Sequence, residues 1–263
     1  MSDDLNFFTD GAAYERLMGR WTVRVGEVFL DWLAPPKGWR WLDVGCGNGA
    51  FTELIVARCA PAMVEALDPS ESQLAYARTR PGARLARFQQ GDAQALPFGD
   101  RTFDAAIMAL VIIFVPDPVK ALSEMARVVR PSGSVAAYMW DMVGGGTPME
   151  PVRAGLAAMN IDVPLPPGSD SARLDRMRDL WQGAGLVGVE TRSIEIEVAY
   201  RDFDDFWQSN TALPNPVTKR IQSMSPAEVE RLKGLLRERI PGGTRGRIAY
   251  SARANAVKGR VPE

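Results

Sequence analysis

The chain has 263 residues, a formal net charge of −1, two cysteines and no histidine. The missing histidine excludes an imidazole general base, a serine–histidine–aspartate triad, histidine-ligated zinc and the two-histidine iron site. Two cysteines are also too few for an all-cysteine zinc site, so no metal centre is expected. Any chemistry must therefore use other side chains or a cofactor that carries its own reactivity.

Composition and charge predict a soluble, globular protein. Hydrophobic residues make up 46% of the chain and charged residues 24%, which is typical of a folded domain. A net charge near zero, with no basic cluster, argues against a nucleic-acid partner. The sequence shows neither a signal peptide nor an apolar run long enough to span a membrane. We therefore expect a cytoplasmic monomer or homodimer with reduced cysteines and no membrane partner.

Hydrophobic periodicity and breaker residues divide the first half of the chain into alternating helices and strands. A helix is expected within residues 11–33, before Pro35 and Gly38 break the chain. The elements expected next are, in chain order, strand 40–44, helix 50–59, strand 63–67, helix 70–79, strand 84–90, strand 103–110, helix 118–130 and strand 134–140. Such alternation predicts an α/β fold, with an open, mostly parallel sheet and helices on both faces.

The pattern changes after Trp140, where glycine and proline clusters interrupt the chain. The elements expected there are helices near 148–160 and 171–184, a strand at 187–200, helical structure over 202–240 and a strand at 246–258. We interpret the chain as one domain in three parts. These are an N-terminal helical lid (1–37), a core (38–141) and a C-terminal part (142–263) that completes the sheet and inserts a helical cap at 142–186 and 202–240.

The sharpest motif is the segment Asp-Val-Gly-Cys-Gly-Asn-Gly, which spans residues 43–49 and connects an expected strand to an expected helix. Glycines allow positive φ and a close approach of the backbone to a ligand. Amides at the start of a helix favour a negatively charged group. The spacing of Gly45, Gly47 and Gly49 departs from the Gly-x-Gly-x-x-Gly fingerprint of NAD-binding folds. The motif therefore predicts a ligand site that is not a standard dinucleotide site.

A second candidate is Asp68, at the end of the next expected strand. Nucleotide-binding α/β folds place a carboxylate there to accept hydrogen bonds from ribose hydroxyls. The alternative is a plain helix cap, although Ser70 could provide that cap with Gln73 as its partner. We favour the ribose-binding role.

These two segments and two further ones resemble class I S-adenosylmethionine (SAM)-dependent methyltransferases, in particular the small-molecule, ubiquinone-pathway-like branch. The four segments, in order, are 43–49, 65–70, 91–98 with 103–104, and 127–134. The resemblance implies SAM as the cofactor. It also implies a Rossmann-like seven-stranded sheet in which the last strand is antiparallel, with a helical cap.

The resemblance further implies a set of cofactor-binding residues. They are Asp43, Gly45, Cys46, Gly47, Gly49, Asp68, Pro69, Gln73, Asp92, Ala93, Leu110 and Val111. The glycines would cradle the methionine end of SAM, with Cys46 as a small filler, and Asp43 would engage the amino group directly or through water. Asp92 would accept a hydrogen bond from the adenine N6 amine, and Ala93 would offer its backbone amide. The simpler interpretations are a tight turn, a solvated or turn-stabilising carboxylate, and ordinary strand core.

One departure from the family concerns the acceptor side. The related branch often carries two histidines just before Pro-Asp-Pro, and Ile113 and Phe114 stand at those positions here, so this wall is apolar. The candidates for binding the acceptor are Tyr14, Phe114, Trp140, Trp181, Phe203 and Trp207, and the cluster of Phe203 and Trp207 also holds Tyr200, Phe206 and Asn210. The simpler interpretation is that each packs the cap. Tyr14 and Asp141 are candidates for a catalytic group, and no catalytic residue is assigned.

The resemblance implies transfer of the SAM methyl group by SN2 displacement, and we expect a small, partly apolar metabolite as the acceptor. Since the sulfonium is the electrophile, the protein mainly aligns donor and acceptor, and no histidine base is required. Two alternatives stay open. One is a non-catalytic SAM-binding or interaction protein, and the less favoured one is an NAD-dependent oxidoreductase.

Overall fold

The computed structural model describes residues 20–211, 215–242 and 246–263. Its centre is a seven-stranded sheet in the order β3-β2-β1-β4-β5-β7-β6. The strands are β1 (Arg40–Val44), β2 (Met63–Asp68), β3 (Ala86–Gln90), β4 (Phe103–Ala109), β5 (Val129–Trp140), β6 (Val187–Tyr200) and β7 (Ile248–Arg260). β7 is antiparallel to both of its neighbours, and the other neighbouring pairs are parallel. The expected α/β fold with an antiparallel last strand is confirmed.

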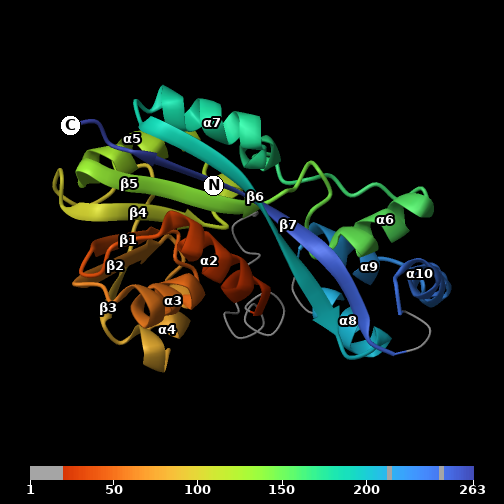
Figure 1. Cartoon of the computed structure of the whole chain (residues 1–263). Coiled ribbons are helices and arrows are strands. Elements are labelled where there is room, and N and C mark those ends of the chain that lie inside the picture. Colours follow the sequence, from red (N-terminus) through yellow and green to blue (C-terminus); the bar gives the residue numbers. More distant parts are fainter. Residues whose placement is uncertain (1–19, 212–214, 243–245) are drawn as a thin grey trace.

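Helices cover both faces of this sheet (Figure 1). One layer holds α2 (Arg20–Leu33), α3 (Ala50–Cys59) and α4 (Glu71–Ala77), and the other holds α5 (Pro118–Val128) and α7 (Leu174–Gly183). α2 forms because its apolar residues recur at helical spacing, and this places one stripe against the sheet. Phe29 of α2, Phe51 of α3 and Tyr138 of β5 meet there, with ring centroids 4.9 to 6.1 Å apart.

The connection between β3 and β4 has no helix of its own. It leaves the edge strand β3 at Gly91 and must pass β2 and β1 to reach β4 at Phe103. The only regular pairing within it is an isolated bridge between Asp92 and Ala95. Tertiary contacts must therefore hold this segment in place.

The long strands β6 and β7 extend past the rest of the sheet. β5 pairs only with residues 254–260 of β7, whereas β6 follows β7 as far as the pair Tyr200–Ile248. This two-stranded extension and the helices around it form a second lobe, which we call the cap (Figure 1). Its helices are α6 (Glu150–Ala158), α8 (Phe203–Thr211), α9 (Pro216–Gln222) and α10 (Pro226–Arg239). The cap lies beyond the carboxyl end of β5.

Among the described residues, two differences from the expected elements concern the C-terminal part of the chain. The helical stretch 202–240 forms three helices, because capping boxes at Asn215 and Ser225, each followed by proline, start α9 and α10. Within the stretch 142–186 expected in the cap, α6 lies in the cap but α7 covers the sheet. No helix in the described ranges is long and apolar enough to cross a membrane.

Candidate cofactor and acceptor site

The glycine-rich turn between β1 and α3 is held tightly between its neighbours. Gly45 and Gly49 have φ angles of 77° and 79°, which side-chain-bearing residues rarely adopt. A Cβ atom on Gly45 would lie 2.6 Å from both Cγ atoms of Val111, and one on Gly49 would lie 2.9 Å from the Cβ of Ala77. Glycine is therefore required at both positions, and the turn offers a backbone-lined cradle at the carboxyl end of β1.

Asp68, the last residue of β2, links this turn to the next one. One carboxylate oxygen accepts from the Gly47 amide at 2.8 Å and the other from the Ser70 amide at 2.9 Å. Burial raises the pKa of Asp68, and the two amide hydrogen bonds oppose that rise. Ser70 caps α4 through the Gln73 amide at 3.4 Å, so the capping role belongs to Ser70. Asp68 keeps lone pairs for a further donor, such as a ribose hydroxyl.

Asp43 of β1 is fully buried beneath the same turn. Its Oδ2 accepts from the Thr52 hydroxyl at 2.6 Å, whereas its Oδ1 has no hydrogen-bond partner among the described residues. Burial raises the pKa of Asp43 to about 7, the Thr52 bond opposes the rise, and the charge of Asp68 adds to it. An unpaired, buried carboxylate oxygen is costly unless a donor reaches it. Together with the cradle above, it fits a ligand that carries an ammonium group.

The other expected cofactor residues gather along the same edge, since the carboxyl ends of parallel strands lie together. The carboxylate of Asp92, which is exposed, accepts from the backbone amide of Gln94 at 2.8 Å, and Ala93 is half-buried in this turn. Leu110 adopts a positive φ of 64° at the end of β4, which places Val111 against Gly45. The rest are Cys46 and Gln73, which are buried, and the exposed Pro69, whose carbonyl accepts from Gln90 at 2.9 Å.

Two further observations define the roles of Cys46 and Asp104. Burial, followed by the charges of Asp43 and Asp68, raises the pKa of the Cys46 thiol well above its usual value, which suits a filler and not a nucleophile. Asp104, which belongs to the third segment of the resemblance, is the second residue of β4 and so lies at the opposite edge of the sheet. Although burial raises its pKa, hydrogen bonds from Arg40 and Arg130 lower the pKa of Asp104 to about 2. Its role is to join β1, β4 and β5.

The expected acceptor-binding residues fall into three places. Trp140 is buried at the end of β5, with an indole N–H that has no partner among the described residues, and Phe114 lies 42% exposed after β4. Phe203 and Trp207 lie in the cap, under the cations of Arg237 and Lys233. Trp181 belongs to α7, and its buried indole donates to the Val135 carbonyl of β5 at 2.8 Å, so the structure does not bring it to the acceptor side. Tyr14 lies outside the described residues.

The cap also contains an aromatic and polar cluster that joins it to the core. Tyr200 meets Trp21 of α2 with ring centroids 5.7 Å apart, and its hydroxyl accepts from Asn210 at 3.3 Å. The hydroxyl of Tyr250 lies 3.4 Å from that of Tyr200 and donates to the Pro148 carbonyl at 2.6 Å. Neither Trp21 nor Tyr250 was expected at the site. Tyr250 pairs with Val198 across the two strands and is therefore a diagonal neighbour of Tyr200 on the same face, which is the signal that could have found it.

Asp141, the second catalytic candidate, is fully engaged. Arg253 donates to its Oδ2 from Nε at 2.9 Å and from Nη2 at 2.7 Å, and the Gly144 amide donates to its Oδ1 at 3.0 Å. These contacts close the loop after β5 onto β7. The geometry therefore assigns Asp141 to structure and does not support a base. In the described ranges, no group of three or more acids and cysteines is placed to hold a metal ion.

Comparison with known proteins points to methyltransferases. A family described as a methyltransferase domain matches residues 42–137. An uncharacterised protein of Mycobacterium tuberculosis is 30% identical over 191 residues, which cover 71% of this chain and 69% of that protein. The ubiquinone/menaquinone biosynthesis C-methyltransferase UbiE of Roseobacter denitrificans is 40% identical over 111 residues, which cover 41% of this chain and 44% of that enzyme.

Solved structures share the fold. The YcgJ protein of Bacillus subtilis has a TM-score of 0.56 at 17% identity, over 91% of this chain and 99% of that one. A phosphoethanolamine N-methyltransferase of Haemonchus contortus, solved with SAM, has a TM-score of 0.57 at 18% identity, over 95% of this chain and 56% of that one.

Proposed function

The chain belongs to the class I SAM-dependent methyltransferases and uses SAM as its cofactor, and we propose that it methylates a small, partly apolar metabolite. The observation that carries the proposal is the position of the cap. β6 and β7 carry its aromatic cluster beyond the same carboxyl edge that holds Asp43, Gly45 and Asp68. Aromatic side chains with a few polar groups suit a small ligand of mixed character.

On the cofactor side, the buried oxygen of Asp43 would receive the ammonium group and the carboxylate of Asp68 would accept from the ribose hydroxyls. Asp92 and the amide of Ala93 would hold the adenine, with Leu110 and Val111 against the cofactor. When bound, SAM supplies a methyl group that its sulfonium already activates. The chain has only to fix that methyl group in line with the acceptor, and alignment of this kind accounts for about 7–11 kcal/mol of a barrier.

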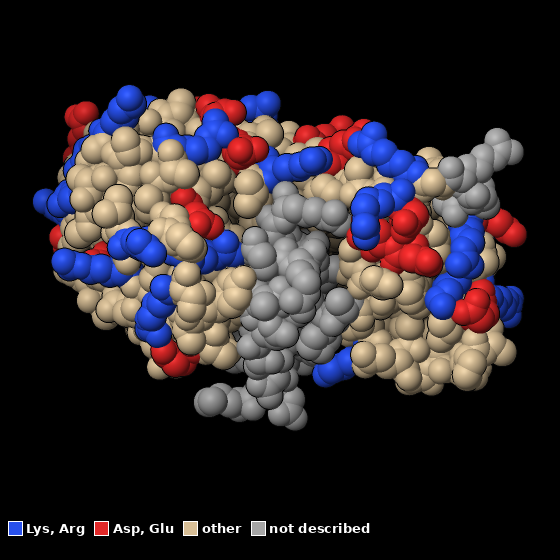
Figure 2. All heavy atoms as spheres, turned by 90° about the horizontal axis from the view of Figure 1, so that it is seen from below, with Lys and Arg blue, Asp and Glu red and all other residues tan. Residues whose placement is uncertain are grey.

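On the acceptor side, we propose an apolar wall and no side-chain base. Ile113 is buried and Phe114 is half-exposed where related proteins often carry histidines, and Asp141 is held by Arg253. A proton released by the acceptor would therefore pass to water. We further propose that the acceptor is a metabolite and not a nucleic acid. On the face drawn in Figure 2, the described basic and acidic side chains are interspersed and do not form one basic surface.

The test is a transfer assay with methyl-labelled SAM and fractionated metabolite extracts. We expect label in a low-mass product, formed together with an equal amount of S-adenosylhomocysteine. An Asp68→Ala variant, which should bind the cofactor poorly, is the matched blank. Tight binding of S-adenosylhomocysteine without transfer to any acceptor would instead identify a non-catalytic SAM-binding protein. Label found only in the macromolecular fraction would overturn the small-molecule assignment.

A further inference from the structure

We propose that Arg127 and Glu124 of α5 are positioning residues for adenine recognition. In this view they fix the connection between β3 and β4 in the conformation that presents Asp92 to the adenine amine. The inference rests on the proposed function, because it takes Asp92 and Ala93 as the adenine-binding residues. Neither Arg127 nor Glu124 touches the cofactor in this proposal, since both act through the backbone of the connection.

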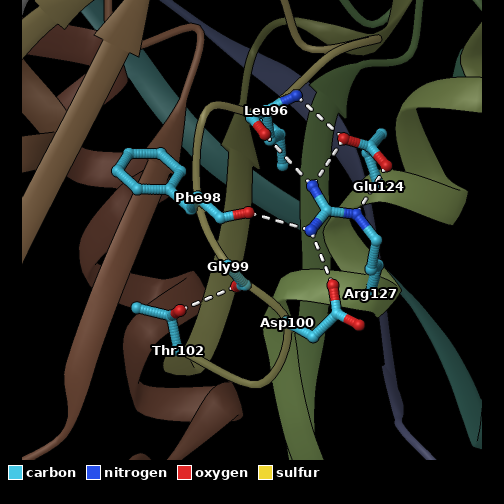
Figure 3. Close-up of polar contacts among 7 residues, drawn as sticks. All are labelled: Leu96, Phe98, Gly99, Asp100, Thr102, Glu124 and Arg127. Atoms are coloured by element: carbon cyan, nitrogen blue, oxygen red, sulfur yellow. Dashed lines mark hydrogen bonds and ion pairs between the residues drawn. The ribbon is translucent and has the colours of Figure 1, made fainter.

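The guanidinium of Arg127 holds the connection at three successive points (Figure 3). Its Nη2 donates to the Leu96 carbonyl at 3.1 Å, and its Nη1 donates to the Phe98 carbonyl at 2.8 Å and to the Asp100 carboxylate at 2.8 Å. Only arginine offers this many donors in a rigid planar group. The Arg127 side chain therefore supplies residues 96–100 with hydrogen bonds that a helix would form within its own backbone.

Glu124 completes the contact from the same face of α5. Its Oε2 accepts from the Leu96 amide at 2.9 Å, and its two oxygens accept from Nε and Nη2 of Arg127 at 2.7 and 2.8 Å. The amide and the carbonyl of Leu96 are thus both bound by one ion pair. Hydrogen bonding to Arg127 lowers the pKa of Glu124, so the carboxylate stays charged at neutral pH.

A short chain of hydrogen bonds leads from Leu96 back to the cofactor edge. The preceding residue, Ala95, donates its amide to the Asp92 carbonyl at 3.0 Å, and the Gln94 amide donates to the Asp92 carboxylate at 2.8 Å. The Gly91 amide donates to the carbonyl of Asp68 at 3.2 Å. The segment is therefore tied to β2 at one end and to α5 at the other. Other contacts also hold the segment: Leu96 is buried, Phe98 meets Phe103 with ring centroids 5.0 Å apart, and the Arg101 amide donates to the Arg127 carbonyl at 3.0 Å. Among these contacts, only the ion pair binds the backbone of Leu96, four residues from Asp92.

A positioning role and a merely stabilising role predict different results when the adenine of the ligand is replaced by hypoxanthine. The Asp92 carboxylate can accept a hydrogen bond from the adenine amine. Hypoxanthine has a carbonyl group in place of this amine, and a carbonyl cannot donate a hydrogen bond. The wild-type protein should therefore bind S-adenosylhomocysteine more tightly than S-inosylhomocysteine, by about tenfold or more for one hydrogen bond to a charged group. Displacement of Asp92 should reduce this ratio, whereas a general loss of stability should not.

The experiment measures the Kd of both ligands by calorimetry for the full chain and for Arg127→Met, Arg127→Lys and Glu124→Gln. The matched control is Arg58→Met, which removes an arginine of similar exposure (38% against 32%) that binds Asp31 and Glu27 away from the connection. We expect Arg127→Met to reduce the ratio by about fivefold or more. Arg127→Lys, which keeps the charge without the planar group, should recover part of it, and Arg58→Met should leave it within about twofold.

Four results would overturn the inference. Equal weakening of both ligands, or a lower melting temperature at unchanged Kd values, would make the ion pair structural only. Equal wild-type affinities for the two ligands would remove the role of Asp92 and of the ion pair together, while binding of S-adenosylhomocysteine would still support the proposed function. Failure of the wild-type protein to bind S-adenosylhomocysteine would reject both proposals. If Arg127→Met does not fold, judged by circular dichroism, Arg127→Lys and Glu124→Gln decide the question.

Discussion

The carboxyl edge of the sheet buries one aspartate on the cofactor side, at β1, and one on the cap side, after β5; we call these sides the cofactor end and the cap end. The two ends satisfy their aspartates in opposite ways. Asp141, beside the cap, accepts from the guanidinium of Arg253 and from a backbone amide. Asp43, beside the cofactor cradle, receives one neutral hydroxyl and leaves an oxygen unpaired. A buried carboxylate that the fold supplies with its own cation is part of the architecture. One that lacks a cation indicates where a charged ligand completes the structure.

The ends also differ in what holds them. The cofactor end consists of backbone turns locked by Asp68 and by the close contacts of Gly45 and Gly49, so little side-chain variation is possible. The cap end is held by side chains, namely the rings and hydroxyls around Tyr200. We therefore infer that the turn fixes the identity of the cofactor and that the identity of the acceptor depends on the cap.

The largest effect that separates the two ends is expected for Asp68→Ala. It removes acceptors for the Gly47 and Ser70 amides and the proposed contact to ribose. Hydrogen bonds to a charged group contribute about 1.5–3 kcal/mol each, so calorimetry should show S-adenosylhomocysteine binding weakened about 100-fold. The control is Asp31→Ala, which removes an exposed carboxylate that pairs with Arg58. An unchanged Kd for Asp68→Ala would reject the ribose role.

Asp43 should give cofactor binding a pH dependence of intermediate size. Only the ionised carboxylate attracts an ammonium group, and the pKa of Asp43 is about 7. The affinity for S-adenosylhomocysteine should therefore fall as the pH drops below 7, by up to about tenfold per pH unit. Calorimetry from pH 5 to 8 measures this slope. Asp43→Asn should bind more weakly at pH 8 and lose the slope, and a slope that persists in this variant would assign it to another group.

The same carboxylate should lower the stability of the ligand-free protein at neutral pH. Its pKa in the folded chain lies above the ordinary 3.8, so the folded state holds the proton more tightly than the unfolded state. Stability therefore decreases as the pH rises from about 4 to about 7. At pH 8, the free energy of unfolding of Asp43→Asn, measured by denaturant titration, should be higher than that of the parent by about 1–4 kcal/mol. A less stable variant would mean that the Thr52 contact outweighs the buried charge.

The sequence predicts the cofactor end far better than the cap, and the reason is the range of the interactions. The turn at residues 43–49 and the strands around it follow from local periodicity and glycine chemistry, and they appear where expected. The ion pair of Asp141 joins residues 112 positions apart, and the contact of Trp21 with Tyr200 joins α2 to the far end of β6. No local pattern encodes such pairs, which is why Asp141 looked available as a base.

The smallest effect is expected for Asp141→Asn, at the cap end. It weakens the pair with Arg253, whose side chain is 38% exposed, so solvent screening limits the loss to about 1 kcal/mol in denaturant unfolding. The Kd of S-adenosylhomocysteine should stay within about twofold, and the pH profile of kcat should not move. A large fall in kcat with binding intact would restore Asp141 as a base and would remove the contrast between the two ends.

The position of β7 has a consequence for how the chain assembles. β7 lies between β5 and β6, yet it is made after both of them. Until residues 248–260 leave the ribosome, β6 has no strand to pair with, β5 keeps an open edge, and Arg253 has not reached Asp141. Completion of the sheet is therefore a late step over long sequence distance. A nascent chain that stalls before this strand exposes two open edges at once, and chaperones or other copies of the chain would bind there first.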